Sequence, residues 1–276
     1  MSVVRGVTDG RITKRPSVRH SVTRRYFVEL RYDGGAYCGW QRQPDMPTVQ
    51  QTIEDALTRL LRVHTEIVGA GRTDTGVNAS YYVAHFESDT AFDIEQLLYK
   101  LNMMLPKDIA IFSITPVTAE AHARFDARER EYRYYISPTK NPFLRHSAWL
   151  YYVPLDVEKM NLAAAKLIEY KDFTSFAKLN SNNKTNICRV MDARWTVEAD
   201  GVLRFTIRAD RFLRNMVRSI VGTLVDVGRG RYTVEEFCAI VEARDLSRSS
   251  AGAPAQGLFL SDVVYPDEVF TKNTNI

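Results

Sequence analysis

The chain has 276 residues, of which 45% are hydrophobic and 25% are charged. This composition is ordinary for a globular protein and excludes a fibrous or largely disordered chain. No apolar run approaches the roughly 20 residues needed to span a bilayer, and the Arg-rich start lacks the continuous apolar stretch of a secretory signal. We therefore expect a cytoplasmic protein, and the alternative interpretation of this start is an organellar transit peptide.

The metal-ligating residue types show no ligand spacing. The three cysteines are far apart in sequence and odd in number, and no CxxC or HxxxH pair accompanies the five histidines. A disulfide framework and a structural zinc site both need such spacing. We expect neither of them, and we expect no metal at the functional site.

The formal net charge of +4 is unevenly distributed. Residues 1–25 hold seven Lys and Arg against Asp9, so this segment carries +6 and the remainder of the chain carries −2. Nucleic-acid binding by the folded body would therefore depend on a local basic cleft, and the tail would add only a nonspecific electrostatic contribution.

From residue 26 onward, short apolar strands alternate with amphipathic helices, and the same order appears twice. Thr48 and Gln51 have the spacing of a capping box at the start of the first helix. In the first half we predict strands at 26–32, 66–68, 81–87 and 109–117, and helices at 49–63 and 94–105.

The second half repeats this order with one additional helix. A turn at Asp200-Gly201 separates two of its strands, and Thr233 with Glu236 gives a second capping-box signal. We predict strands at 131–137, 190–198, 203–209 and 258–265, and helices at 157–169, at 213–227 and from Thr233 onward.

This repeated order predicts an α+β fold made of two ferredoxin-like βαββαβ halves, residues 26–118 and 119–276. Their antiparallel sheets would join side by side and leave a central cleft between the halves. Residues 1–25 would form a basic, disordered extension. A cleft of that kind suits a polymer better than a small metabolite.

The most informative motif lies between two predicted strands, at residues 69–77. Three glycines in this segment surround one carboxylate, Asp74, which follows Arg72 by two residues. The glycines permit turns and close backbone approaches that a Cβ would block. As an anonymous pattern, the segment is typical of a tight hairpin turn with a surface ion pair, and it lacks the Lys-Ser/Thr of a phosphate-binding Walker loop.

The segment GAGRTDTGVNA nevertheless resembles the signature of the TruA family of tRNA pseudouridine synthases. The resemblance extends over about residues 26–266, because further family motifs follow in the same order. These include YDG at 32–34, GWQRQ at 39–43, LPKDI at 105–109, FDAR at 125–128, YRY at 132–134, DFTSF at 172–176, NMVR at 215–218 and GL at 257–258.

The chain departs from the family pattern at three positions. Thr75 stands where the family usually has alanine, Asn78 where it has histidine and Phe259 where it has tyrosine. Because an amide does not titrate, Asn78 puts in doubt any pH-dependent role at its position.

The resemblance implies isomerisation of uridine to pseudouridine without a cofactor. Asp74 would be the catalytic carboxylate, which either attacks the sugar or the base or removes a sugar proton. Tyr132 would stack on the uracil and assist proton transfer. Arg218 would form an ion pair with Asp74 from a helix that also carries Arg214 one turn away, whereas both arginines could instead extend into solvent.

The remaining candidate residues would bind the substrate. Leu258 would form the apolar wall opposite the tyrosine ring, or simply fill the core. Arg72 would occupy the space left by the flipped nucleotide, or pair with Asp74. Phosphate contacts would come from Arg42, Arg211 and Arg214, although each of them could equally be a solvated surface charge.

The family resemblance implies tRNA as the substrate, at uridines 38, 39 and 40 of the anticodon stem-loop. Three adjacent targets for one pocket favour recognition of shape and backbone over base edges. A homodimer is implied as well. The competing hypotheses are a relative that acts on another RNA site, a noncatalytic RNA-binding module, and an unrelated hydrolase using Asp74, for which we find no paired carboxylate.

Overall fold

The computed structural model describes residues 23–178 and 184–271. Its first half contains four strands and two helices. The strands are β1 (Arg24–Tyr32), β2 (Ile67–Gly69), β3 (Asn78–Ser88) and β4 (Ile109–Val117), and the helices are α1 (Val49–Leu61) and α2 (Ile94–Met104).

The second half contains five strands and three helices among the described residues. The strands are β5 (Glu129–Ser137), β6 (Trp149–Leu150), β7 (Val190–Val197), β8 (Leu203–Ala209) and β9 (Leu258–Val264). The helices are α3 (Val157–Lys166), α4 (Met216–Gly228) and α5 (Val234–Ala243). All elements predicted from the sequence are present, and the two-residue strand β6 is an addition.

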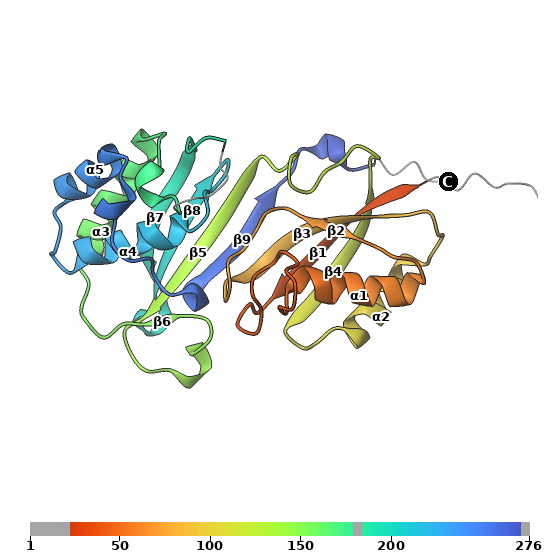
Figure 1. Cartoon of the computed structure of the whole chain (residues 1–276). Coiled ribbons are helices and arrows are strands. Elements are labelled where there is room, and N and C mark those ends of the chain that lie inside the picture. The colour runs from red at the N-terminus through yellow and green to blue at the C-terminus, as the bar shows by residue number, and fades with distance from the viewer. Residues whose placement is uncertain (1–22, 179–183, 272–276) are drawn as a thin grey trace, which may run out of the picture.

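One nine-stranded sheet runs through both halves in the order β4-β1-β3-β9-β5-β8-β7, with β2 paired to β3 and β6 paired to β5. Neighbouring strands are antiparallel except for β3 with β9 and β5 with β6. The helices form two groups over the two ends of the sheet, while β9 and β5 run between them (Figure 1). The protein therefore has a mixed α+β fold built on one large, mostly antiparallel sheet.

Local chemistry sets the helix boundaries. Thr233 and Glu236 form the complete capping box of α5, whereas only the Thr48 half of the predicted box at α1 is present. Helix α1 ends at Leu61, two residues earlier than predicted, because Arg62 has a left-handed backbone with φ of 59°. Helix α4 begins at Met216, three residues later than predicted, because Asn215 is left-handed as well, with φ of 65°.

The predicted boundary of the N-terminal extension also shifts. Strand β1 begins at Arg24, so Arg24 and Arg25 belong to the sheet. Arg25 pairs with Glu87 of β3 and donates a hydrogen bond to the carbonyl of Ala121 at 2.8 Å. The remaining part of the predicted extension, residues 1–22, lies outside the described residues.

Two large apolar clusters fill the space between the sheet and the two helix groups. The second-half cluster contains Val77, which comes from the loop that carries Asp74 in the first half. Tyr132 of β5 packs against both clusters. The loop containing Asp74 is therefore anchored in the core of the opposite half.

The two halves of the sheet meet at a short parallel pairing. Asn78 of β3 is opposite Phe259 of β9, and Ala79 is opposite Leu260. The buried side-chain amide of Asn78 accepts a hydrogen bond from the Gly34 amide at 2.7 Å and donates to the Gln256 carbonyl at 2.9 Å. Asn78 thus connects the first-half loops to the segment that leads into β9.

Outward-facing side chains on the second half of the sheet form ion pairs with one another. Buried Glu131 of β5 pairs with Arg133 at 2.8 Å and with Arg208 of β8 at 2.8 Å. Arg208 also reaches Glu129 and Asp262. These residues alternate along their strands with those of the apolar cluster, so this face of the sheet carries charge where the other face carries helices.

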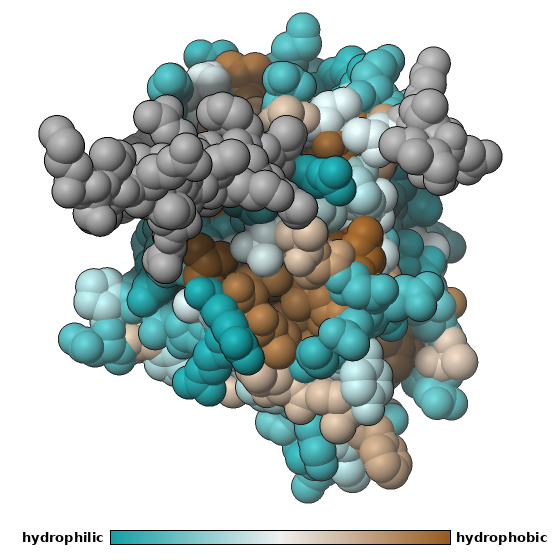
Figure 2. Space-filling model, turned by 90° about the vertical axis from the view of Figure 1, so that its right-hand side faces the viewer, coloured by the Kyte–Doolittle hydropathy of each residue, from teal (hydrophilic) through white to brown (hydrophobic). Residues whose placement is uncertain are grey.

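Apolar side chains also reach the surface at the first-half end of the molecule. Figure 2 shows them gathered near the centre of this end, bordered by polar residues. The large hydrophobic residues exposed in the first half are Met46, Val63, Val68, Tyr99, Met103 and Met104. Within the described ranges, no helix is long and apolar enough to cross a membrane.

Replacing Asn78 by alanine tests the connection between the halves. Asn78→Ala would leave the buried Gly34 amide and the part-buried Gln256 carbonyl without their partner, so we expect a loss of about 2–4 kcal/mol in the free energy of unfolding. Urea denaturation measures this loss, and Ser80→Ala, at an exposed position of the same strand, is the control. Equal stability of the two variants would contradict this role of Asn78.

Candidate active site

Asp74 lies in a tight turn that leads directly into β3. The backbone carbonyl of Asp74 accepts a hydrogen bond from the Val77 amide at 3.1 Å. Gly76 has φ of +75°, which an L side chain rarely adopts, and its amide donates to the Tyr37 carbonyl at 3.3 Å. The turn directs the Asp74 side chain outward, with 26% of its surface exposed.

Residues 32–40 pack beneath this turn. A Cβ on Gly39 would lie 2.4 Å from the carbonyl oxygen of Thr73, so only glycine allows this approach. The Trp40 amide donates to the same carbonyl at 3.2 Å, and the hydroxyls of Tyr32 and Thr73 are 2.8 Å apart. These contacts explain why the YDG and GWQRQ motifs accompany the Gly-rich segment in the sequence.

The ion pair at Asp74 differs from the one predicted. Nε of Arg214 lies 3.3 Å from Oδ1 of Asp74, whereas Nε of Arg218 donates to the Ala253 carbonyl at 2.6 Å. The predicted pairing of Asp74 with Arg218 is therefore wrong for this structure. Because the left-handed Asn215 ends the loop before α4, Arg214 lies outside the helix and extends toward Asp74.

Tyr132, which belongs to β5, lies beside Asp74. Its ring makes an edge-to-face contact with Phe212, with 5.0 Å between the centroids. Burial raises the pKa of the Tyr132 hydroxyl to about 12, and the negative charge of Asp74 adds to this shift. The hydroxyl is therefore neutral at physiological pH and can donate a hydrogen bond.

Leu258 is the first residue of β9 and is buried in the same apolar cluster as Val77. The preceding Gly257 packs against the ring of Tyr134, where a Cβ would lie 2.7 Å from the ring. The segment leading to Leu258 is held by the hydrogen bond from Arg218 to Ala253. The structure thus brings Asp74, Tyr132 and Leu258 to the junction between the two halves.

The other predicted substrate-binding arginines have different surroundings. Arg72 is exposed, and no residue of the described ranges forms a hydrogen bond or ion pair with its side chain. Arg42 is half-exposed and pairs with buried Glu54 at 3.1 Å. Arg211 donates to the Thr185 carbonyl at 3.4 Å. Arg72 is thus exposed and unpaired within the described ranges, whereas Arg42 already neutralises a buried carboxylate.

Two residues near the site were not recognised as structural supports from the sequence. Asn78 was noted only as a departure from the family pattern. Arg130 was not singled out, although its position two residues before Tyr132 places it on the same face of the strand. Its partners are distant in sequence, so no local pattern indicates its role.

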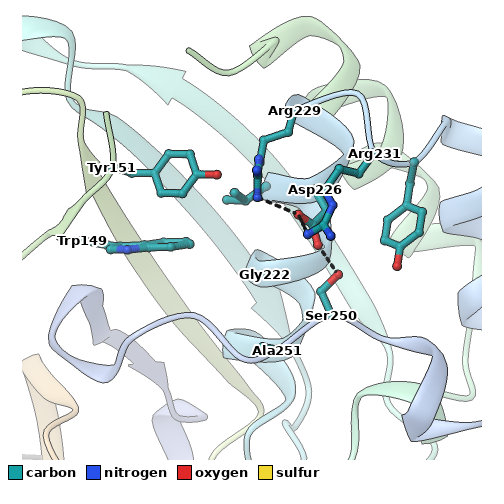
Figure 3. Close-up of a pocket in the computed structure, with 10 residues that line it drawn as sticks. Trp149, Tyr151, Gly222, Asp226, Arg229, Arg231, Ser250 and Ala251 are labelled. Atoms are coloured by element: carbon teal, nitrogen blue, oxygen red, sulfur yellow. Dashed lines mark hydrogen bonds and ion pairs between the residues drawn. The ribbon is translucent and has the colours of Figure 1, made fainter. Parts of the chain in front are cut away.

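A separate pocket of about 340 Å³ lies toward the C-terminal end of α4 (Figure 3). Asp226 is one of its lining residues and forms ion pairs with Arg229 at 3.6 Å and Arg231 at 3.2 Å and accepts a hydrogen bond from the Ser250 hydroxyl at 2.7 Å. Asp226 is ten residues beyond Met216, the start of α4, a distance of about 15 Å along a helix. Asp74 is not among the residues that line this pocket.

The chain matches proteins of known type over most of its length. A family model described as tRNA pseudouridine synthase matches residues 30–126 and 163–266. A tRNA pseudouridine synthase A of Parabacteroides distasonis is 52% identical over 90% of this chain and 98% of its own length. A tRNA pseudouridine synthase A of Bacteroides fragilis is 49% identical over 89% of this chain and 98% of its own length. Another, of Gloeobacter violaceus, is 39% identical over 90% of this chain and 83% of its own length.

The fold and the junction site therefore belong to an RNA-modifying protein. The matches cover well over half of the chain, and the chain belongs to the tRNA pseudouridine synthase family.

Replacing each arginine by methionine separates the roles of Arg214 and Arg218. The pair of Arg214 with Asp74 is largely exposed, so Arg214→Met should cost only about 0–1 kcal/mol of stability. Its single-turnover rate should fall about 10- to 100-fold, which corresponds to about 1.4–2.7 kcal/mol of lost transition-state stabilisation. Arg218→Met removes a part-buried hydrogen bond and should cost about 1–3 kcal/mol of stability.

Thermal melting and single-turnover assays on both variants measure these effects. A strongly destabilised Arg214→Met together with a stable, inactive Arg218→Met would contradict the assignment.

Proposed function

We propose that this protein isomerises uridine to pseudouridine in tRNA, at positions 38, 39 and 40 of the anticodon stem-loop. The observation that carries the proposal is the placement of Asp74, in a chain of the tRNA pseudouridine synthase family, beside a neutral tyrosine and an exposed arginine. The target positions come from the resemblance to the TruA family.

The reaction is redox-neutral and loses no atoms. The bond between N1 of uracil and C1′ of ribose breaks, the base turns, and a new bond forms between C5 and C1′. The hydrogen on C5 leaves as a proton, and N1 gains one. A carboxylate suffices to begin this sequence, either as a nucleophile toward the sugar or the base or as the base that removes a sugar proton. Both routes require Asp74 to be ionised.

Arg214 forms an ion pair with Asp74 in this proposal. A guanidinium 3.3 Å from the carboxylate orients it by a charge-assisted hydrogen bond. Arg218 contributes indirectly, because it holds the Ala253 segment that leads to Leu258. Arg218 thus takes a supporting role in place of the catalytic one expected from the resemblance.

The uracil ring would lie between Tyr132 and Leu258. Tyr132 offers an aromatic face and a hydroxyl that burial keeps protonated, so the hydroxyl can donate a hydrogen bond to the base or pass on the C5 proton. Leu258 supplies an apolar wall. This arrangement lets the detached uracil turn without strong polar contacts that would fix it in one orientation.

Arg72 would stabilise the flipped-out state of the target nucleotide. Its side chain is exposed, lies two residues from Asp74 and has no partner within the described part of the chain. Extrusion of a paired nucleotide costs a few kcal/mol, which a guanidinium on the backbone phosphates can offset. Arg211 and Arg214 lie on the loop before α4 and would extend this contact along the backbone, whereas Arg42 would contribute less because it is paired with Glu54.

The same proposal includes the architecture and the assembly. The strand order β4-β1-β3 with β2, and β9-β5-β8-β7, supports the interpretation as two ferredoxin-like halves whose junction lines an RNA-binding cleft. The resemblance implies a homodimer in the cytoplasm that uses no cofactor.

Replacing Asp74 by asparagine tests the proposed chemistry. Asp74→Asn keeps the shape of the side chain and removes its charge, so isomerisation should be abolished while folding and tRNA affinity are retained. Mass mapping of pseudouridine in tRNA incubated with the purified variant measures the activity. Asp55→Asn, on the exposed face of α1, is the control and should remain active. More than trace turnover by a verified Asp74→Asn protein would reject the assignment.

The role of Arg72 predicts a dependence on the position of the target. Arg72→Ala should lower turnover more on a uridine in the stem than on one in the loop, because an unpaired base is cheaper to extrude. Its melting temperature should be unchanged, since the side chain is exposed and unpartnered within the described residues. Single-turnover rates on tRNAs that carry one target uridine each provide the measurement. An equal defect at every position would argue against a role in flipping.

A further inference from the structure

Arg130 of β5 makes hydrogen bonds with all four terminal N–H groups of its guanidinium. Nη1 donates to the carbonyls of Ala127 at 2.8 Å and Asp210 at 2.9 Å. Nη2 donates to the carbonyls of Arg124 at 2.7 Å and Ala70 at 3.2 Å. All four acceptors are backbone carbonyls, so these four hydrogen bonds fix the path of the main chain.

The four carbonyls come from three segments that surround the candidate active site. Ala70 lies four residues before Asp74, and Asp210 lies four residues before Arg214. Arg124 and Ala127 belong to the connection between β4 and β5, the strands on either side of the boundary between the halves. A single side chain therefore holds the loop of Asp74, the loop of Arg214 and the connection between the halves in one arrangement.

Only a guanidinium meets this geometry. Its two terminal nitrogens carry two hydrogens each in a rigid plane, whereas the ammonium group of lysine has one nitrogen with three hydrogens. No carboxylate within the described residues forms an ion pair with Arg130. Burying part of a cation without a carboxylate partner costs free energy of folding, because the cation loses hydration. The charge also acts on the site, because it opposes the effects of burial and of Asp74 on the pKa of Tyr132.

We propose that Arg130 is a positioning residue for the isomerisation, which sets the separation and orientation of Asp74 and Arg214 across the junction. This inference rests on the proposed tRNA pseudouridine synthase activity. Arg130 does not touch the substrate. It acts through the two loops whose backbone carbonyls accept its hydrogen bonds. A displacement of about 1 Å at a reacting group can lower a rate about 100-fold. Loss of the four hydrogen bonds of Arg130 should therefore affect the chemical step more than tRNA binding.

The test compares Arg130→Ala and Arg130→Lys with the parent protein, after the parent has been shown to form pseudouridine in tRNA. A parent without activity would reject the proposed function before any variant is considered. Arg133→Ala is the matched control, because Arg133 lies on the same strand, faces the other side of the sheet and pairs with Glu131. All rates are measured well below the melting temperature of each variant and expressed per folded molecule.

We expect Arg130→Ala to lower the single-turnover rate about 100-fold while its tRNA affinity stays close to that of the parent. Arg130→Lys should also be impaired, because it keeps the charge but cannot make four bonds. A purely structural role would lower the melting temperature and leave the rate per folded molecule unchanged, which would overturn the proposal. A parent-like rate in Arg130→Lys would overturn it too, and this variant decides the question if Arg130→Ala does not fold.

A double-mutant cycle with Arg214→Met provides a second readout. If Arg130 acts by placing the loop of Arg214, the two losses of rate should be less than additive in the double variant. The cycle of Arg133→Ala with Arg214→Met should be additive. Additive losses in the Arg130 cycle would overturn the proposal.

Discussion

The short parallel pairing of β3 with β9 is the contact on which the site depends. Two residue pairs, Asn78 with Phe259 and Ala79 with Leu260, join the halves of the sheet directly after the turn that carries Asp74. Val77 in that turn packs into the core of the second half. Because the turn is held from both sides, the position of Asp74 is set by the junction rather than by the first half alone.

Around this junction, burial and charge are divided among different side chains. Asp74 and Arg214 are partly exposed, where RNA would reach them in the proposed function, while Tyr132 is partly buried and keeps its proton. The backbone beneath them is fixed by the hydrogen bonds of Asn78 and Arg130. Such a division places Asp74, the carboxylate that we propose as catalytic, on rigid supports.

The fold could largely be predicted from the sequence, because the apolar periodicity of strands and helices is a local property. Helix boundaries failed where single residues adopt a left-handed backbone, as at Arg62 and Asn215. The second failure changed the predicted ion pair, since it took Arg214 out of the helix. Arg130 was missed for another reason: its four acceptors are distant backbone carbonyls, which leave no pattern of residue types.

The central claim, that the turn around Asp74 and the loop before α4 together receive the RNA, is tested most directly by hydrogen–deuterium exchange. Amide exchange of the parent protein would be followed with and without unmodified tRNA. The account predicts slower exchange on tRNA binding in residues 69–78 and 210–218, on both sides of the junction. Unchanged exchange in both segments, with protection confined to the pocket around Asp226, would contradict it.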